Sequence, residues 1–93
     1  TDATWIKSAY PNPAGTSQSA HFDISVKSGD TASLRIFNAK GQLIKEYQTI
    51  EAGNHHIAWD KKDSYHQDCA SGIYFYQLVS LGYSSIKKMM ILN

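Results

Sequence analysis

Apolar and polar residues alternate one by one along most of this chain. In residues 20–27, AHFDISVK, the side chains of Phe22, Ile24 and Val26 share one face and polar side chains share the other. This period of two is typical of a β-strand with one buried face. No stretch long enough for a helix shows helical spacing, and turn signals rich in Gly, Asn and Asp separate the alternating stretches. The pattern predicts an all-β fold.

Seven short strands account for these stretches, which favours an antiparallel β-sandwich over the alternative of an open barrel. The first strand is expected to end before Pro11 and Pro13, which interrupt a ladder. Residues 20–27 and 31–38 are predicted to form a hairpin around Ser28-Gly29-Asp30. The looser pattern of residues 42–50 indicates an edge strand, and IYFYQLVS at 73–80 indicates a central strand covered on two sides. The expected strands are residues 5–9, 20–27, 31–38, 42–50, 55–59, 73–80 and 84–92.

Composition and charge exclude several classes of protein. The 93 residues are 42% hydrophobic, which is enough for one folded domain without room for a second. Nine Lys and Arg against eight Asp and Glu give a net charge of +1, with no basic stripe for nucleic acid. No apolar run is long enough to cross a membrane, and the single Cys69 excludes an internal disulfide. The first residue is not Met and no signal peptide follows, so we expect a piece of a longer protein.

Several short motifs occur in a fixed order along the chain. They are Tyr10-Pro11-Asn12-Pro13, residues 38–44 (NAKGQLI), Ala52-Gly53, residues 57–60 (IAWD), residues 70–76 (ASGIYFY) and residues 87–92 (KKMMIL). Together they resemble the type A C-terminal sorting domain of proteins exported by the type IX secretion system, also called the Por secretion system. They also resemble the related immunoglobulin-like domain of flagellar hook-capping proteins. The resemblance covers residues 10–92.

This resemblance implies a fold and a function. It implies an immunoglobulin-like or fibronectin-like sandwich at residues 10–93, preceded by a linker and first strand at residues 1–9. The domain would direct an N-terminal passenger through an outer-membrane secretion pore, from the periplasm to the surface of a Gram-negative bacterium. A sortase would then cut at or before about residues 1–8. No catalysis, cofactor or metal is expected of the domain itself, which is expected to be a monomer or a weak edge-strand dimer.

The resemblance also assigns recognition to particular residues. Gly41 and Gly72 fit turns or strand starts that need a positive φ. One of the pairs Tyr74/Tyr76 and Ile73/Phe75 must face the core, and an exposed aromatic pair would be either a docking patch or ordinary cross-strand packing. The last strand fits an edge open to strand addition, with its lysines alternatively serving only to deter unwanted pairing. The assigned residues are Tyr10, Pro11, Asn12, Pro13, Gly41, Gly72, Tyr74, Tyr76, Lys87, Lys88, Met89, Met90, Ile91 and Leu92.

The polar stretch 60–71 departs from the family pattern. Lys61 and His66 stand where many relatives have glycine, so the loop is expected to follow backbone angles open to other residues. His66 and Cys69 have the spacing of a zinc-chelating pair or of a base and nucleophile, and three aspartates nearby suggest calcium. We disfavour all three interpretations and expect Cys69 to be a small buried residue. The aspartates concerned are Asp60, Asp63 and Asp68.

Two non-enzymatic functions remain as alternatives to sorting. One is a structural or adhesive immunoglobulin-like module that binds other proteins. The other is a carbohydrate-binding module, which needs at least two exposed aromatic rings in a line. Trp59 shares a face with Ile57 and is expected in the core, which leaves Trp5 alone as a platform.

Overall fold

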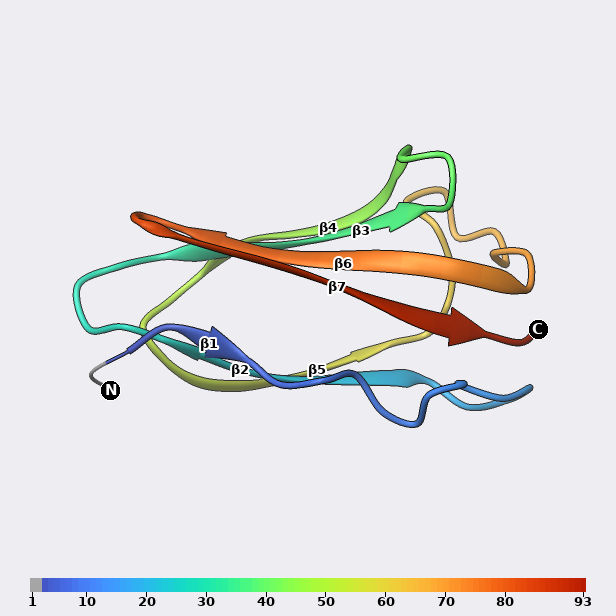
Figure 1. Ribbon diagram of the computed structural model, residues 1–93, viewed down its shortest axis with the longest axis horizontal. Coiled ribbons are helices and arrows are strands. Elements are labelled where there is room, and N and C mark those ends of the chain that lie inside the picture. Colours follow the sequence, from blue (N-terminus) through green and yellow to red (C-terminus); the bar gives the residue numbers. More distant parts are fainter. Residues whose placement is uncertain (1–2) are drawn as a thin grey trace.

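The computed structural model describes residues 3–93 and forms two antiparallel sheets packed face to face (Figure 1). One sheet has the order β1-β2-β5 and the other the order β4-β3-β6-β7. The part of the chain that is described contains no helix, and therefore none that spans a membrane. The predicted all-β sandwich is confirmed. The strands are β1 (Trp5–Ile6), β2 (Ala20–Val26), β3 (Ala32–Asn38), β4 (Leu43–Ile50), β5 (Gly53–Trp59), β6 (Gly72–Ser80) and β7 (Tyr83–Ile91).

The predicted hairpin of residues 20–38 is wrong. β2 pairs with β1 and β5, whereas β3 pairs with β4 and β6 in the other sheet. The turn around Gly29 therefore carries the chain from one sheet to the other. Each strand has one apolar face, and these faces meet across the core, where the rings of Phe22 and Tyr76 lie 5.1 Å apart. Alternation fixes which side chains point inward but not which strand lies alongside.

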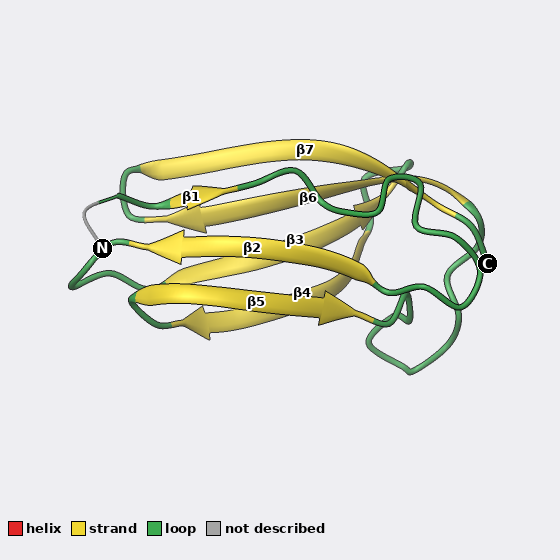
Figure 2. Cartoon of the chain, turned by 90° about the horizontal axis from the view of Figure 1, so that it is seen from below, coloured by secondary structure: helices red, strands yellow, loops and turns green. Residues whose placement is uncertain are grey.

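The core lies between the two sheets and draws on every strand. β4 lies at an edge, as its looser pattern predicted, and β6 lies between β3 and β7. Only one face of β6 is buried, however, because the smaller sheet lies over its inner side (Figure 2) and no second layer of the described residues covers its outer side (Figure 1). The expectation that β6 is covered on both sides is wrong. The largest fully buried side chains are Trp59, Tyr76, Phe22, Ile24, Leu34, Ile36, Leu78, Met89, Ile91 and Val26.

Candidate functional site at the end of the last strand

Residues 10–15, which we call the N-terminal arm, cross from one sheet to the other. Tyr10 exchanges two backbone hydrogen bonds with His21 of β2, of 3.1 and 2.8 Å. Four residues later, Ala14 donates to the carbonyl of Met90 at 3.0 Å and accepts from the amide of Leu92 at 2.8 Å. Pro11 and Pro13 lie in between, where pairing changes from β2 to β7, and neither has an amide hydrogen to leave unpaired.

The arm covers only the last part of the edge of β7. The amide of Met90 also donates to Oδ1 of Asn12, at 3.0 Å. Along an antiparallel strand, the backbone N–H and C=O groups of successive residues point alternately toward and away from the neighbouring strand. Like Met90, the other even-numbered residues of β7 therefore direct these groups away from β6. Ser84, Ile86 and Lys88 therefore turn their backbone groups toward the open side of β7, beyond the reach of the arm. This edge is free at residues 84–88 and occupied at residues 90–92.

Lys61 ties the arm to the end of the chain. Its side chain is only 3% exposed, and its Nζ donates to the carbonyls of Gly15 at 2.6 Å and Leu92 at 2.8 Å. A buried ammonium group is costly unless it is hydrogen-bonded, and bonds from a charged donor are the stronger kind. No pattern in the sequence indicates this role, because Lys61 lies in a polar loop, where a lysine side chain is ordinarily solvated.

The final residue is bound to the same loop. The backbone amide of Asn93 donates to Oγ of Ser71 at 2.8 Å, and its side-chain amide donates to the carbonyl of Cys69. The arm, the loop at residues 60–71 and the last residues of the chain thus form one connected structure. We call it the C-terminal clamp.

Two residues of the loop that are not glycine adopt backbone angles that favour glycine. Lys61 has φ of 63° and His66 has φ of 65°, both in the left-handed region. The expectation of ordinary angles is therefore wrong, and the loop adopts these angles at the cost of backbone strain. Aspartates support the turns, since Oδ1 of Asp63 accepts from the amides of Tyr65 at 2.8 Å and Gln67 at 3.0 Å.

The other aspartates of the loop are engaged as well. Oδ1 of Asp60 accepts from the amide of Lys62 at 3.0 Å, and Asp68 forms an ion pair of 2.7 Å with the Lys62 side chain. The hydrogen bond between these two side chains lowers the pKa of Asp68 and raises the pKa of Lys62. The carboxylates thus serve the loop's own conformation.

The predicted recognition residues divide into exposed and buried sets. Lys88, Met90 and Leu92 point outward, whereas Met89 and Ile91 are in the core. The arm residues Asn12 and Pro13 are also exposed, beside this part of β7, while Pro11 and Lys87 are partly buried.

Tyr74 and Tyr76 form the inward pair of β6. The Tyr76 hydroxyl accepts from the amide of Ala9 at 2.9 Å, and the Tyr74 hydroxyl donates to the carbonyl of Ala70 at 2.7 Å. Tyr74 thus holds the loop of the clamp from inside the sandwich, and Tyr76 holds the residue just before the arm. The pair that faces outward on this strand is therefore Ile73 and Phe75, both partly buried, which the sequence left open as the other possibility.

Gly41 and Gly72 adopt the positive φ angles expected of them, 83° and 153°. No heavy atom would touch a Cβ added at either position, so conformation rather than close approach requires glycine. The turn that contains Gly41 and the start of β6 border a shallow cleft, which is lined by Asn38, Lys40, Ser71 and Gly72 among others. Gly41 and the clamp therefore belong to the same end of the molecule.

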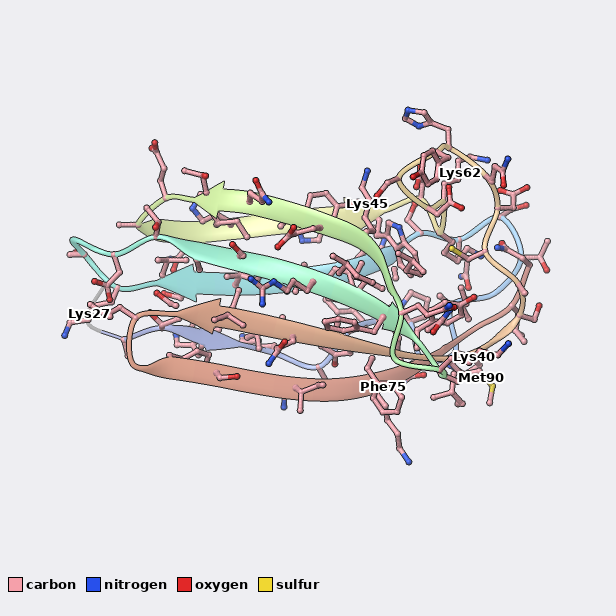
Figure 3. All side chains as sticks on the ribbon, turned by 90° about the horizontal axis from the view of Figure 1, so that it is seen from above. Lys27, Lys40, Lys45, Lys62, Phe75 and Met90 are labelled. Atoms are coloured by element: carbon pink, nitrogen blue, oxygen red, sulfur yellow. The ribbon has the colours of Figure 1, made fainter. Side chains whose placement is uncertain are left out.

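An apolar patch covers the outer face of the larger sheet at this end. Across β4, β3, β6 and β7 the cross-strand neighbours are Leu43, Phe37, Phe75 and Lys88, with Ile73 beside Met90 in the next row. Leu43 is 50% and Met90 40% exposed. Phe37, Phe75 and Ile73 are partly buried beside them. Figure 3 shows Phe75, Met90 and Lys40 at one end of the sheet and Lys27 at the other. Neighbouring apolar side chains that reach the surface in this way mark interaction sites. We call these residues, Leu43, Phe37, Phe75, Ile73, Met90 and Lys88, the outer-face patch.

Cys69 is buried and has no features of an activated nucleophile. Burial, followed by the nearby charge of Asp63, raises the pKa of its thiol. A catalytic thiol needs the opposite shift. This agrees with the expectation that Cys69 fills a small apolar space.

The two tryptophans do not form a sugar-binding row. Trp59 is fully buried, as expected, and its indole donates to the carbonyl of Lys62 at 2.8 Å. Trp5 is 37% exposed, and the ammonium of Lys7 lies 5.4 Å from its ring centre. With Trp59 buried, the two tryptophans do not provide the two exposed aromatic rings in a line that a carbohydrate-binding module would use.

Comparisons with known proteins agree on the fold and the family. The family model described as the secretion system C-terminal sorting domain matches residues 8–92. A search of curated proteins gave no match.

Two solved structures share the fold. PorZ of Porphyromonas gingivalis, described as an essential bacterial surface component of the type IX secretion system, is 17% identical with a TM-score of 0.66. Dimeric latent PorU of the same organism is 23% identical with a TM-score of 0.71. The matches cover 98% and 99% of this chain but only 12% and 10% of those proteins. The chain belongs to the family of secretion system C-terminal sorting domains, the non-catalytic signals that mark proteins for export by the type IX system to the cell surface or beyond.

Proposed function

We propose that this domain carries an N-terminal passenger to the type IX outer-membrane pore and is afterwards removed by a sortase. The observation that supports this most is the C-terminal clamp. It brings together family motifs that lie about eighty residues apart in the chain, through the contacts of Ala14 with Met90 and Leu92.

We further propose that the secretion machinery binds the outer-face patch together with the free edge of β7. The patch combines apolar side chains that reach the surface with Lys88, and Lys40 lies at the same end of the sheet (Figure 3). The adjoining edge of β7 offers unpaired backbone groups to an added strand. The described chain starts at the opposite end of the molecule from the outer-face patch (Figure 1). A passenger attached there leaves the surface accessible.

The structure supports a cleavage site before residue 3. The carbonyl of Ala3 accepts from Oγ of Ser25 at 3.2 Å, and Oγ1 of Thr4 accepts from the amide of Lys27 at 3.0 Å. Residues 3–9 are thus held on the sandwich by hydrogen bonds rather than free to enter the cleft of a protease. Part of the predicted linker, Thr1 and Asp2, lies outside the described residues.

The test is export of a reporter fused upstream of Thr1 in a host with the type IX machinery. Phe75→Lys/Met90→Lys places charges in the outer-face patch without touching the core, and Leu81→Lys is the matched control at the other end, where Leu81 is 87% exposed. We expect the intact and control fusions outside the cell and the patch variant in the periplasm. Retention of the intact fusion with a folded domain would contradict the sorting role. Export of the folded patch variant would contradict only the proposed surface.

A further inference from the structure

Two histidines meet on the outer face of the smaller sheet, away from the C-terminal clamp. In the antiparallel pairing of β2 with β5, His56 lies opposite Asp23, and His21 lies opposite Ala58, so the two histidines are diagonal neighbours. Nδ1 of His21 and Nε2 of His56 are 3.1 Å apart. The sequence analysis tested His66 and Cys69 as a metal-binding pair and did not bring His21 and His56 together, because it assigned β2 to the wrong partner strand.

Asp23 fixes the orientation of His56. Its Oδ1 lies 2.8 Å from Nδ1 of His56, and its Oδ2 accepts from the Tyr10 hydroxyl at 3.0 Å. An ionised carboxylate facing Nδ1 keeps the proton on that nitrogen and leaves the lone pair on Nε2, directed at His21.

Stacked rings hold both imidazoles in place. The Tyr10 ring stacks on His21 with centres 5.4 Å apart, and His21 stacks on His56 with centres 5.1 Å apart. The arrangement has three features of a metal site: two nitrogen ligands that converge, a carboxylate behind one of them, and side chains that are already ordered.

We propose that Nδ1 of His21 and Nε2 of His56 bind one borderline divalent transition metal ion, such as Zn²⁺ or Cu²⁺, in place of the hydrogen bond between them. With metal–nitrogen bonds of about 2.05 Å, a separation of 3.1 Å corresponds to an angle of about 98° at the metal. Tetrahedral and tetragonal sites both accommodate that angle.

Water supplies the remaining ligands. Within residues 3–93 no group of three or more His, Cys, Asp or Glu side chains is placed to hold a metal. The site is therefore open and weaker than a four-ligand structural site, and the sandwich does not depend on it for folding. The charge of Asp23 favours a cation here, while Lys7, which lies near enough to affect Asp23, opposes it. Neutral imidazoles favour Zn²⁺ and Cu²⁺ over the hard ions Mg²⁺ and Ca²⁺.

The test is calorimetric titration of the full chain with ZnCl₂ and with CuCl₂ at pH 7.5, with MgCl₂ as the negative control. His21→Ala and His56→Ala should each weaken binding at least about tenfold. The matched controls His55→Ala and His66→Ala remove imidazoles outside the pair and should leave the affinity within about twofold of the parent. Equal loss in the controls, or binding unchanged in His21→Ala, would overturn the proposal.

Asp23→Asn provides a second variant that keeps both ligands. It should weaken zinc binding by about tenfold, because the carboxylate no longer fixes the His56 proton. Nitrogen NMR of the parent should show zinc shifting Nδ1 of His21 and Nε2 of His56. Zinc bound without these shifts would place the ion elsewhere. The proposal is independent of secretion, so neither result bears on the sorting role.

Discussion

Lys61 and His66 share a backbone conformation but differ in what their side chains do. Both have a left-handed φ, which an L-residue adopts only at a cost. His66 is exposed, whereas Lys61 is buried and donates to two carbonyls. The family resemblance singled out both positions, because many relatives have glycine there. No pattern in the sequence, however, shows that the side chain of Lys61 stabilises the fold and that of His66 does not.

Substituting glycine at these two positions should change stability in opposite directions. His66→Gly should raise the free energy of unfolding by up to about 1 kcal/mol, because strain relief exceeds the entropy that glycine adds to the unfolded chain. Lys61→Gly should lower it by about 2 kcal/mol, because the lost hydrogen bonds of a charged donor outweigh the same relief. Urea unfolding of both variants measures the difference. Changes of the same sign would show that the Lys61 ammonium does not stabilise the clamp.

The Cys69 thiol should react slowly with alkylating reagents. Its pKa is raised by burial and by Asp63, so the folded protein holds less thiolate at any pH near 8 than the unfolded chain does. The neutral Cys69 thiol therefore contributes stability that is fully present below the pKa of the unfolded chain. This stability is lost as pH rises through the higher pKa of the folded protein. Iodoacetamide labelling at pH 8, with and without urea, tests the prediction. Equal rates in both conditions would show that the thiol is accessible.

At the scale of the strand, the sequence predicted positions well and partners poorly. The bounds of β2, β3, β4 and β6 fall within one residue of those expected, because side-chain alternation is set locally. Pairing depends on contacts across the sheet, and a short turn such as Ser28-Gly29-Asp30 serves equally for a hairpin or for a crossing between sheets. For the same reason the contact of His21 with His56 could not be predicted, because it depends on the register of β2 with β5.

Proline substitutions at adjacent positions test which edge of β7 is free. The Ser84 amide points away from β6, so Ser84→Pro should cost no more than about 1 kcal/mol. The Ser85 amide points toward Leu78 of β6, so Ser85→Pro should cost about 1–3 kcal/mol more by leaving an acceptor unpaired. Thermal unfolding of both variants measures the difference. Equal losses would mean that the edge at residues 84–88 is not open.

For the whole molecule, the two ends of the sandwich have different roles. The domain measures 37 × 22 × 20 Å, with its strands along the long axis (Figure 1). One end holds simple turns such as Leu81-Gly82, and the other holds the clamp, where the arm, the loop and Asn93 meet. Motifs distant in sequence converge there because β7 runs toward that end and the arm crosses to it. Family resemblance located these motifs, but their physical connection through Lys61 required the fold.

Deleting the last seven residues, 87–93, should unfold the domain as well as remove its recognition segment. Removal of residues 87–93 also removes Met89 and Ile91, which are 2% and 0% exposed in the core. Replacing one such side chain by alanine lowers the free energy of unfolding by about 2–5 kcal/mol, and the whole free energy of unfolding of a domain is about 5–15 kcal/mol. We therefore expect the truncated chain to lose its cooperative thermal transition by circular dichroism. The full-length double variant Lys88→Ala/Met90→Ala removes only exposed side chains of the same segment and should keep that transition. A cooperative transition in the truncated chain would contradict the prediction and would make the last strand a separable signal rather than part of the core.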